Sequence, residues 1–215
     1  MTNPLYFPYG TTEIEHLKSR DKKLGAAVDL IGPIKRAVNP DLFSALIKSI
    51  VGQQISTKAQ ATVWQRLTEH FAPFGPETLA AAKLAEIQGC GMSLRKAEYI
   101  QGISQAVYSK EIDLNGLKGL PDKEVISQLT KLRGVGVWTA EMLLIFSLQR
   151  PDVVSFGDLA IQRGMRMLYR HRKITRQLFE KYRRRYSPYG TTASLYLWAL
   201  AGGALPDLTD PAPKR

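Results

Sequence analysis

The stretch from residue 129 to residue 163 constrains the fold of this chain more than any other. A helix-like run over residues 122–132 leads into a tight turn with the sequence R-G-V-G, residues 133–136. A second helix is expected over residues 137–148, and few polar residues interrupt it. A helix that is apolar almost all round is typical of a core rather than of a surface. The pattern predicts two helices joined by a glycine turn, followed by a lone carboxylate, Asp158.

Gly134 and Gly136 stand between these two helices, and two interpretations of them are open. Glycine lets the backbone turn sharply and approach another group without a Cβ atom in the way. The second helix opens at this turn, so its unpaired N–H groups suit an anion such as a phosphate. The alternative is a glycine that ends the first helix before an ordinary connection, and the two glycines taken alone favour this alternative.

The charge balance indicates a polyanionic partner. The chain has 215 residues, enough for one large domain or two joined lobes, and its 30 Lys and Arg against 19 Asp and Glu give a net charge of +11. This excess favours nucleic acid as the partner. The chain has a single cysteine, Cys90, so an internal disulfide and a cysteine-ligated iron–sulfur cluster are both excluded. Cys90 itself is interpreted as a small buried filler. The three histidines are far apart in the sequence, which argues against a histidine metal site.

Nothing in the sequence indicates a membrane or secreted protein. Residues 1–10 lack the basic start and apolar core of a signal peptide. The longest apolar stretches, residues 142–146 and 195–205, are too short or too interrupted to span a bilayer. We therefore expect an intracellular protein, in the cytoplasm with the nucleoid or in a nucleus, that acts as a monomer.

Helical periodicity dominates the chain, and alternation with a period of two residues is almost absent. We therefore expect an all-α fold without a sheet. Thr11 or Thr12 is expected to cap the first helix, and Ser93 to cap a later one. Further helices are expected over residues 22–31, from residue 41 to the G-Q-Q-I turn at 52–55, and over residues 57–71, 76–82, 93–109, 159–169 and 192–202.

A strongly basic run follows Asp158. Residues 163–185 contain ten Lys or Arg and one acid, Glu180, with Tyr169, Tyr182 and Tyr186 interleaved. A solvated helical face is the ordinary explanation of such a run. Because a third of the basic residues gather here, we favour a phosphate-binding surface.

The hairpin and the aspartate together resemble a known superfamily. The pattern L-x-x-L-R-G-V-G-V-W-T-A, followed 20 residues after Trp138 by Asp158, is similar to the helix-hairpin-helix (HhH-GPD) DNA glycosylases. It is most similar to their alkylpurine branch, the 3-methyladenine DNA glycosylase II type. The resemblance covers roughly residues 42–203, and the hairpin with its aspartate is the most specific part.

The resemblance implies an all-α, two-lobed fold with the active site in the cleft between the lobes. Residues 42–150 would form the central lobe, with the helix-hairpin-helix at 122–148. Residues 1–41 and 151–215 would form the second lobe and carry the catalytic aspartate.

The resemblance gives Asp158 the catalytic role, beside an oxocarbenium-like sugar that a fixed negative charge stabilises. Its position also permits a plain helix cap for residues 159–169, and the two roles are compatible. Relatives that also nick the strand carry a Schiff-base lysine where this chain has Trp138. The attacking group is therefore expected to be water, oriented by Asp158.

The base pocket is also inferred from the resemblance. Trp138, Trp198, Gln53 and Met142 are expected to line it, and Gln54 is expected to be the wedge that fills the gap in the duplex. Core packing is the alternative for both tryptophans. Bacterial relatives have Tyr where this chain has Met142, which affects any inference about base preference.

The hairpin is expected to bind DNA phosphate and, as in relatives, a monovalent cation. The expected phosphate-binding residues are Arg133, Gly134, Gly136, Val137, Thr139 and Arg163. The expected cation ligands are the carbonyls of Thr130, Leu132 and Val135, holding Na⁺ or K⁺; no cofactor is required, and no side chain is expected to bind a metal.

The resulting hypothesis is a monofunctional DNA glycosylase, without lyase activity, that excises cationic alkylated purines such as 3-methyladenine from damaged duplex DNA. One alternative is a glycosylase for deaminated or oxidised bases. The other is a non-catalytic protein that uses the hairpin only to bind DNA structure.

Overall fold

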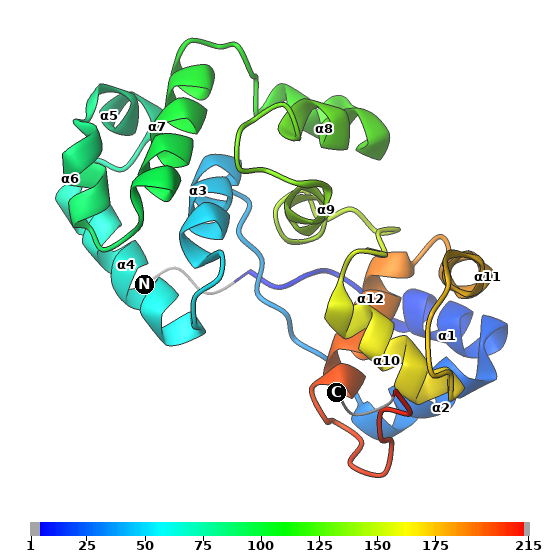
Figure 1. The fold of residues 1–215 in the computed structure, drawn as a ribbon. Helices are drawn as coiled ribbons and strands as arrows, with labels where there is room; N and C mark the ends of the chain where they lie inside the picture. The colour runs from blue at the N-terminus through cyan, green and yellow to red at the C-terminus, as the bar shows by residue number, and fades with distance from the viewer. Residues whose placement is uncertain (1–4, 213–215) are drawn as a thin grey trace. The chain divides into compact units, whose positions relative to one another are not determined.

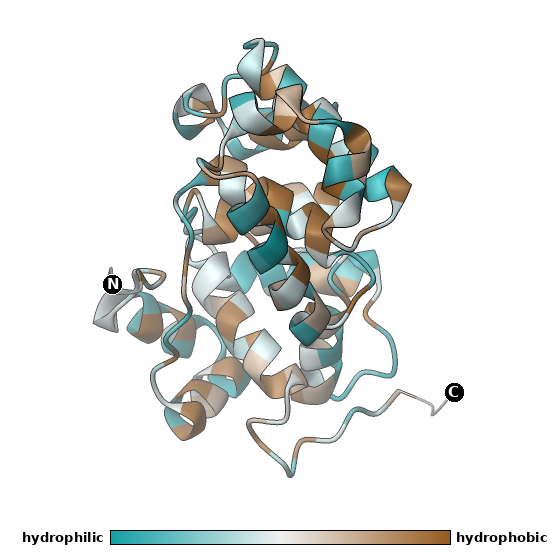
Figure 2. Ribbon diagram, turned by 90° about the vertical axis from the view of Figure 1, so that its left-hand side faces the viewer, coloured by the Kyte–Doolittle hydropathy of each residue, from teal (hydrophilic) through white to brown (hydrophobic). Residues whose placement is uncertain are grey.

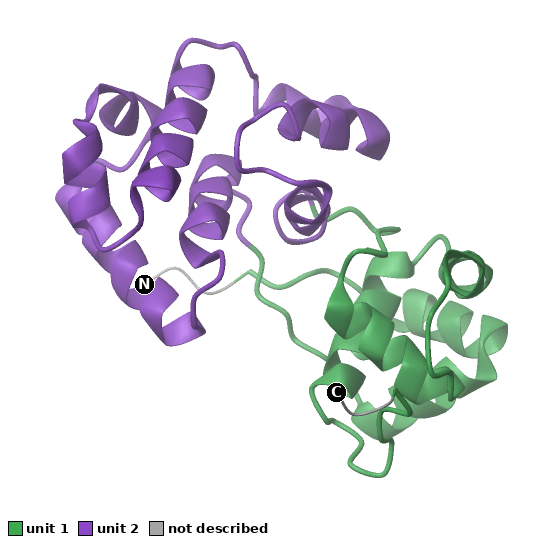
Figure 3. Cartoon of the chain, viewed as in Figure 1, with its two compact units in different colours: residues 1–38, 149–215 green, residues 39–148 purple. Residues whose placement is uncertain are grey.

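The chain is all-helical in a computed structural model that describes residues 5–212 (Figure 1). The expected fold class is confirmed: no β-strand occurs among these residues, and the only pairing of that kind is an isolated antiparallel bridge between Tyr6 and Ala37. The chain divides into two compact units, coloured separately in Figure 3. Unit 1 comprises residues 1–38 and 149–215, and unit 2 comprises residues 39–148.

Unit 2 contains the glycine hairpin. Helix α7 packs against three other helices of this unit, α3, α5 and α6, while α9 packs against α3 and α8. In Figure 2, hydrophobic and hydrophilic residues alternate along most helices, as expected where one face is buried. The helices of unit 2 are α3 (Leu42–Gly52), α4 (Thr57–His70), α5 (Pro76–Ala81), α6 (Leu84–Gly89), α7 (Leu94–Tyr108), the 3₁₀ turn η1 (Gly116–Gly119), α8 (Asp122–Leu129) and α9 (Val137–Phe146).

Side-chain caps fix where several of these helices begin. The carboxylate of Asp41 accepts the backbone N–H of Ser44 at the start of α3. The hydroxyls of Ser56 and Ser93 accept backbone N–H groups at the starts of α4 and α7. Each cap satisfies one of the N–H groups that a helix leaves without an internal partner, so these starts follow from local sequence.

Several expected boundaries were wrong. Helix α8 ends at Leu129 and not at residue 132, because residues 130–132 tighten into turns before the hairpin. The first helix, α1 (Thr11–Arg20), begins after Gly10, so neither threonine is its N-cap; the Glu13 carboxylate instead accepts the N–H of Gly10. The short helices α6 and η1 were not expected, since helices this short show little periodicity.

The interpretation of α9 as a helix buried all round is correct only for its later turns. Leu143, Leu144 and Ile145 are buried. Val137 and Trp138, which open the helix, are 55% and 48% exposed. The first turn of α9 therefore presents two apolar side chains, those of Val137 and Trp138, to solvent.

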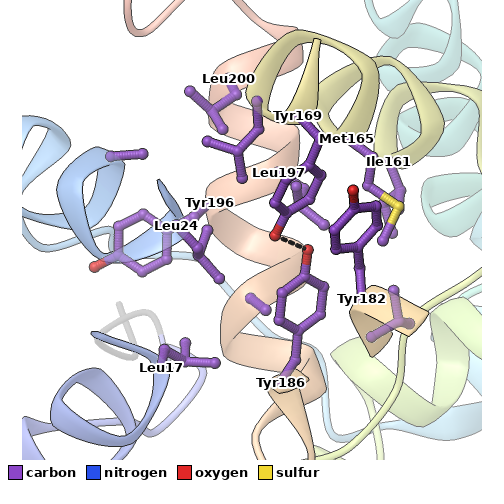
Figure 4. Close-up of a cluster of buried hydrophobic side chains, with 14 of the residues drawn as sticks. Leu17, Leu24, Ile161, Met165, Tyr169, Tyr182, Tyr186, Tyr196, Leu197 and Leu200 are labelled. Carbon is purple, nitrogen blue, oxygen red and sulfur yellow. Dashed lines mark hydrogen bonds between the residues drawn. The ribbon is translucent and has the colours of Figure 1, made fainter. Parts of the chain in front are cut away.

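Unit 1 is built from α1, α2 (Lys22–Ile31), α10 (Leu159–Tyr169), α11 (Arg176–Tyr186) and α12 (Gly190–Ala201). Its core contains Tyr169, Tyr182 and Tyr186 (Figure 4). The rings of Tyr169 and Tyr182 stack with centroids 3.6 Å apart, and the hydroxyls of Tyr169 and Tyr186 are hydrogen-bonded at 2.7 Å. The three tyrosines interleaved with the basic run therefore belong to the core of unit 1.

Cys90 is buried, as expected of a small filler residue, and burial raises the pKa of its thiol.

Within residues 5–212, no helix combines the length and the apolar character needed to cross a bilayer.

Candidate functional site

The turn between α8 and α9 needs glycine at position 134 for two reasons. Gly134 has φ +88°, a backbone conformation that other residues adopt rarely. A Cβ atom at this position would also lie 2.4 Å from Cδ2 of Tyr99, a residue of α7. The turn is closed by the N–H of Val135, which donates to the carbonyl of Leu132 at 3.1 Å.

Gly136 is the N-cap of α9, and no side chain caps this helix. The carbonyl of Gly136 accepts the first helical hydrogen bond, from Ala140 N–H at 3.0 Å. The first N–H groups of a helix have no partner within it, and they lie at the positive end of the helix dipole. Gly136, Val137 and Trp138 are all exposed. The start of α9 is thus accessible and chemically suited to a phosphate.

The structure brings five of the six expected phosphate-binding residues together. Arg133, Gly134, Gly136 and Val137 lie in or beside this turn, and Arg133 is exposed. Thr139 lies there too, but the whole residue is only 6% exposed, so it is less accessible than Gly136 and Val137. Arg163 is separate: it belongs to α10 of unit 1, with its Nε 3.8 Å from the Asp210 carboxylate.

The turn between α3 and α4 contains Gln53 and Gln54. Gln54 is exposed and has φ +58°, in the left-handed region that non-glycine residues rarely occupy. The side chain of Gln53 donates from Nε2 to the carbonyl of Gly134 at 2.9 Å. This hydrogen bond joins the Gln53–Gln54 turn to the glycine hairpin, although 81 residues separate its two ends in the sequence.

A cavity of about 440 Å³ opens between these elements within unit 2. Trp138, Met142 and Gln53, all expected in a base pocket, line it together with the expected wedge, Gln54. The remaining lining residues are Ser49, Gly52, Gln60 and Thr139.

Ser49 and Gln60 are cavity residues that the sequence analysis missed. Ser49 lies one helical turn before Gly52 on α3, so helical spacing could have indicated it. Nothing in the sequence marked Gln60 as a cavity residue. Its Nε2 donates to the carbonyl of Lys48, and a Cβ atom at Gly52 would lie 2.2 Å from this nitrogen. A larger residue at position 52 would therefore displace the Gln60 side chain from this place.

Asp158 lies in unit 1 as the N-cap of α10, so the expected capping role is confirmed. Its Oδ1 atom accepts the backbone N–H of Ile161 at 2.8 Å and the indole N–H of Trp198 at 3.2 Å. The residue is buried, with 6% of its surface exposed. Two N–H donors aimed at one carboxylate oxygen fix its orientation and stabilise its negative charge.

Trp198 reaches Asp158 because α10 and α12 pack closely. A Cβ atom at Gly164 of α10 would lie 2.2 Å from the carbonyl oxygen of Leu197 on α12, so only glycine allows this approach. Trp198 packs against the core of unit 1, which agrees with the core alternative. Its hydrogen bond to Asp158 was not anticipated, because 40 residues separate the two in the sequence.

Residues 47–188 match the family model described as "HhH-GPD superfamily base excision DNA repair protein". The match spans more than half of the 215 residues and includes the hairpin and Asp158. This chain belongs to the HhH-GPD superfamily. The resemblance to this superfamily and to its 3-methyladenine glycosylase branch is confirmed.

One curated protein and two solved structures are similar to this superfamily member over nearly its whole length. DNA-3-methyladenine glycosylase 1 of Schizosaccharomyces pombe is 32% identical over 209 residues, which cover 93% of this chain and 91% of the relative. The crystal structure of a DNA-3-methyladenine glycosidase from Bacillus halodurans superposes with a TM-score of 0.83 at 35% identity, covering 92% of this chain and 93% of that one. The Schizosaccharomyces pombe 3-methyladenine DNA glycosylase Mag1, in complex with abasic DNA, gives 0.80 at 31% identity, covering 93% and 100%.

Half of the basic side chains in the basic run of this HhH-GPD chain pair with three of its own acids. Five of its ten basic side chains form ion pairs: Arg163 and Arg166 with Asp210, Arg176 and Arg183 with Glu180, and Arg185 with Asp21. The pairing with Asp210 raises the pKa of Arg166 and lowers that of Asp210. The other five, Arg170, Arg172, Lys173, Lys181 and Arg184, are exposed. These five side chains, together with the exposed Arg163 and Arg176, have the accessibility that a phosphate contact requires.

The expected cation ligands lie in one segment of the hairpin. Thr130, Leu132 and Val135 all fall between α8 and α9, and the carbonyl of Leu132 already accepts the N–H of Val135. A carbonyl has a second lone pair, so this bond leaves the donor set compatible with a monovalent cation. The cation stays a prediction. Over residues 5–212, no cluster of three or more His, Cys, Asp or Glu side chains could hold a metal ion.

Proposed function

We propose that this chain is a monofunctional DNA glycosylase that removes cationic alkylated purines, such as 3-methyladenine, from damaged duplex DNA in base excision repair. The observation that carries the proposal is Asp158, a buried carboxylate held by the N–H groups of Ile161 and Trp198. It follows the hairpin of a base excision superfamily at the expected distance. Relatives that match more than nine-tenths of the chain are named 3-methyladenine glycosylases or glycosidases.

Recognition begins with removal of the damaged base from the stack, because a base inside a duplex cannot reach an enzyme's pocket. The exposed start of α9 binds a backbone phosphate through its N–H groups. Gln54 fills the gap left in the duplex, and the cavity beside Trp138 and Met142 receives the base. That the cavity and Asp158 act on one nucleotide, in a cleft between the lobes, stays a prediction.

Asp158 then stabilises the reacting sugar. As the bond between the sugar and the base lengthens, C1′ gains positive charge, and a carboxylate of fixed orientation stabilises it. Water, oriented by Asp158, attacks C1′ and releases one proton to the solvent. The base leaves with the electron pair of the broken bond, and an abasic site remains.

The hairpin supplies no amine for covalent chemistry. Trp138 stands where bifunctional relatives carry the Schiff-base lysine, and its neighbours Val137 and Thr139 cannot replace one. The reaction therefore stops at the abasic site without cutting the strand.

The preference for charged purines follows from the groups around the cavity. The half-exposed indole of Trp138 attracts a cationic base by about 0.5–1 kcal/mol, the range for exposed cation–π pairs. A cationic base leaves as a neutral molecule and needs no proton. Neutral bases need a general acid, and no histidine occurs between His70 and His171.

No cofactor is required by this mechanism. A Na⁺ or K⁺ on the carbonyls of Thr130, Leu132 and Val135 would stiffen the hairpin. We further propose that the protein acts as an intracellular monomer on DNA.

The test is base release from methylated duplex DNA, with chromatographic identification of the released bases. Release of 3-methyladenine well above the rate of hypoxanthine supports the proposal. Faster release of hypoxanthine, uracil or an oxidised base would assign a different lesion class. Tight DNA binding without release of any base would leave the non-catalytic alternative.

A further inference from the structure

Lys96, on α7, has no role in the function described so far. Its ammonium donates to two main-chain carbonyls of another segment, that of Val51 at 2.9 Å and that of Gln53 at 2.5 Å. Burial lowers the pKa of this ammonium. Both carbonyls lie at the end of α3, where a helix has carbonyls without internal partners and the negative end of its dipole. The ammonium thus fastens the end of α3 to α7.

The carbonyl of Gln53 belongs to the peptide group that leads into Gln54. Gln54 is exposed with φ +58°, a conformation that a residue of this type keeps only when its surroundings hold it. Lys96 holds the carbonyl of this peptide group. The side chain of the same residue, Gln53, is fixed by its hydrogen bond to the carbonyl of Gly134. Gln54 is therefore presented from a turn anchored both to α7 and to the hairpin.

We propose that Lys96 is the positioning residue of the wedge: its ammonium holds the Gln53–Gln54 peptide so that Gln54 is ready to enter the duplex. This inference rests on the proposed base-flipping function and adds to it a residue that does not itself touch DNA. A lysine that contacts DNA directly would place its ammonium toward solvent. Lys96 places it on two carbonyls of the protein.

The experiment compares two substrates within each variant. One duplex carries 3-methyladenine in a base pair, which the wedge must help to open. The other carries the same lesion opposite an abasic-site analogue, where no pair has to be broken. Because both rates scale with the fraction of folded enzyme, their ratio is unaffected if Lys96→Met lowers that fraction.

Lys96→Met removes the ammonium and keeps the length of the side chain. We expect single-turnover release from the paired duplex to fall about tenfold and release from the unpaired one to change less than threefold. Lys48→Met is the matched control, since Lys48 is an exposed lysine on α3 and its loss should leave the ratio unchanged. Equal losses on both substrates would overturn the proposal, because wedge placement matters only where a pair is opened.

A double variant tests whether Lys96 acts through Gln54. Gln54→Ala should itself lower release from the paired duplex, and Lys96→Met should add little in that background. Effects that multiply would show that Lys96 acts elsewhere. If the wild type releases no base from either duplex, the proposed function fails, whatever Lys96 does.

Chemical rescue separates the ammonium from the shape of the side chain. Lys96→Cys, alkylated with bromoethylamine, regains an ammonium at nearly the length of lysine. Cys90 is buried, and the treated wild type controls for its modification. Recovery of the paired-duplex rate on alkylation supports the proposal, and no recovery in a folded, fully alkylated protein contradicts it.

Discussion

Helices α9 and α10 begin with opposite solutions to the same physical problem. Each leaves N–H groups without partners at its first turn, at the positive end of the helix dipole. At α10 the protein supplies the anion, since Asp158 accepts the N–H of Ile161 and is buried. At α9 the N-cap is Gly136, which has no side chain to cap the helix, and residues 136–138 are exposed. The comparison shows how one kind of helix start can hold a carboxylate for chemistry in one place and receive a phosphate in another.

The largest effect is expected where the anion at α10 is removed. Asp158→Asn is nearly isosteric and still caps a helix, so folding and DNA binding should persist. Loss of the carboxylate charge should lower single-turnover base release by about two to three orders of magnitude, the scale seen when a preorganised electrostatic group is lost. Thermal unfolding and DNA binding serve as controls. Activity within a few-fold of wild type would leave Asp158 as a cap only.

A smaller loss is expected when the carboxylate keeps its charge and loses one donor. Trp198→Phe retains an aromatic ring and removes the indole N–H that reaches Asp158. A hydrogen bond to a charged group contributes about 1.5 kcal/mol or more, so release should fall roughly tenfold on charged and neutral bases alike. Rates equal to wild type in a folded variant would mean that this bond does not orient Asp158.

Giving α9 the same kind of cap as α10 tests the anion site directly. At Gly136 the backbone is extended, and a Cβ atom would have no neighbour within 4 Å, so Gly136→Asp can fold. Its carboxylate should occupy the helix start, weakening DNA binding about tenfold while leaving thermal stability unchanged or higher. Gly136→Ser is the neutral control. Undiminished affinity at low salt would show that phosphate does not bind here.

The open start of α9 carries Trp138, and replacing this residue should change the preference of the enzyme for charged over neutral bases. Trp138→Ala should cost 3-methyladenine release more than hypoxanthine release, by about two- to fivefold, because a half-exposed cation–π pair contributes about 0.5–1 kcal/mol. Release of the two bases is measured in parallel with both proteins. Equal losses would make the indole a wall of the cavity without an electrostatic role.

The smallest expected effect is none. Borohydride should trap no covalent complex with substrate DNA. The reason is that Trp138 occupies the hairpin position where bifunctional relatives carry the Schiff-base lysine. A bifunctional glycosylase treated in parallel confirms that trapping works. A trapped complex that depends on a lysine of this chain would contradict the monofunctional mechanism.

Local sequence alone determined much of the fold and the outline of the candidate site. The glycine turn, the Ser93 cap at the start of α7 and the N-cap position of Asp158 were all predicted. Each depends on groups within three or four residues of one another, where capping and glycine geometry act. Spacing along α9 likewise brought Trp138 and Met142 to one cavity, since residues four apart share a helix face.

Tertiary structure alone decided which groups meet across the chain. The bonds of Trp198 to Asp158, of Gln53 to Gly134 and of Lys96 to the end of α3 each join segments at least 40 residues apart. No local pattern encodes such bonds, because a polar side chain has many possible partners until packing selects one. The same reason explains the tyrosines of the basic run. Their sequence neighbours are cations, yet the surfaces that α10, α11 and α12 bury against one another place the rings in the core.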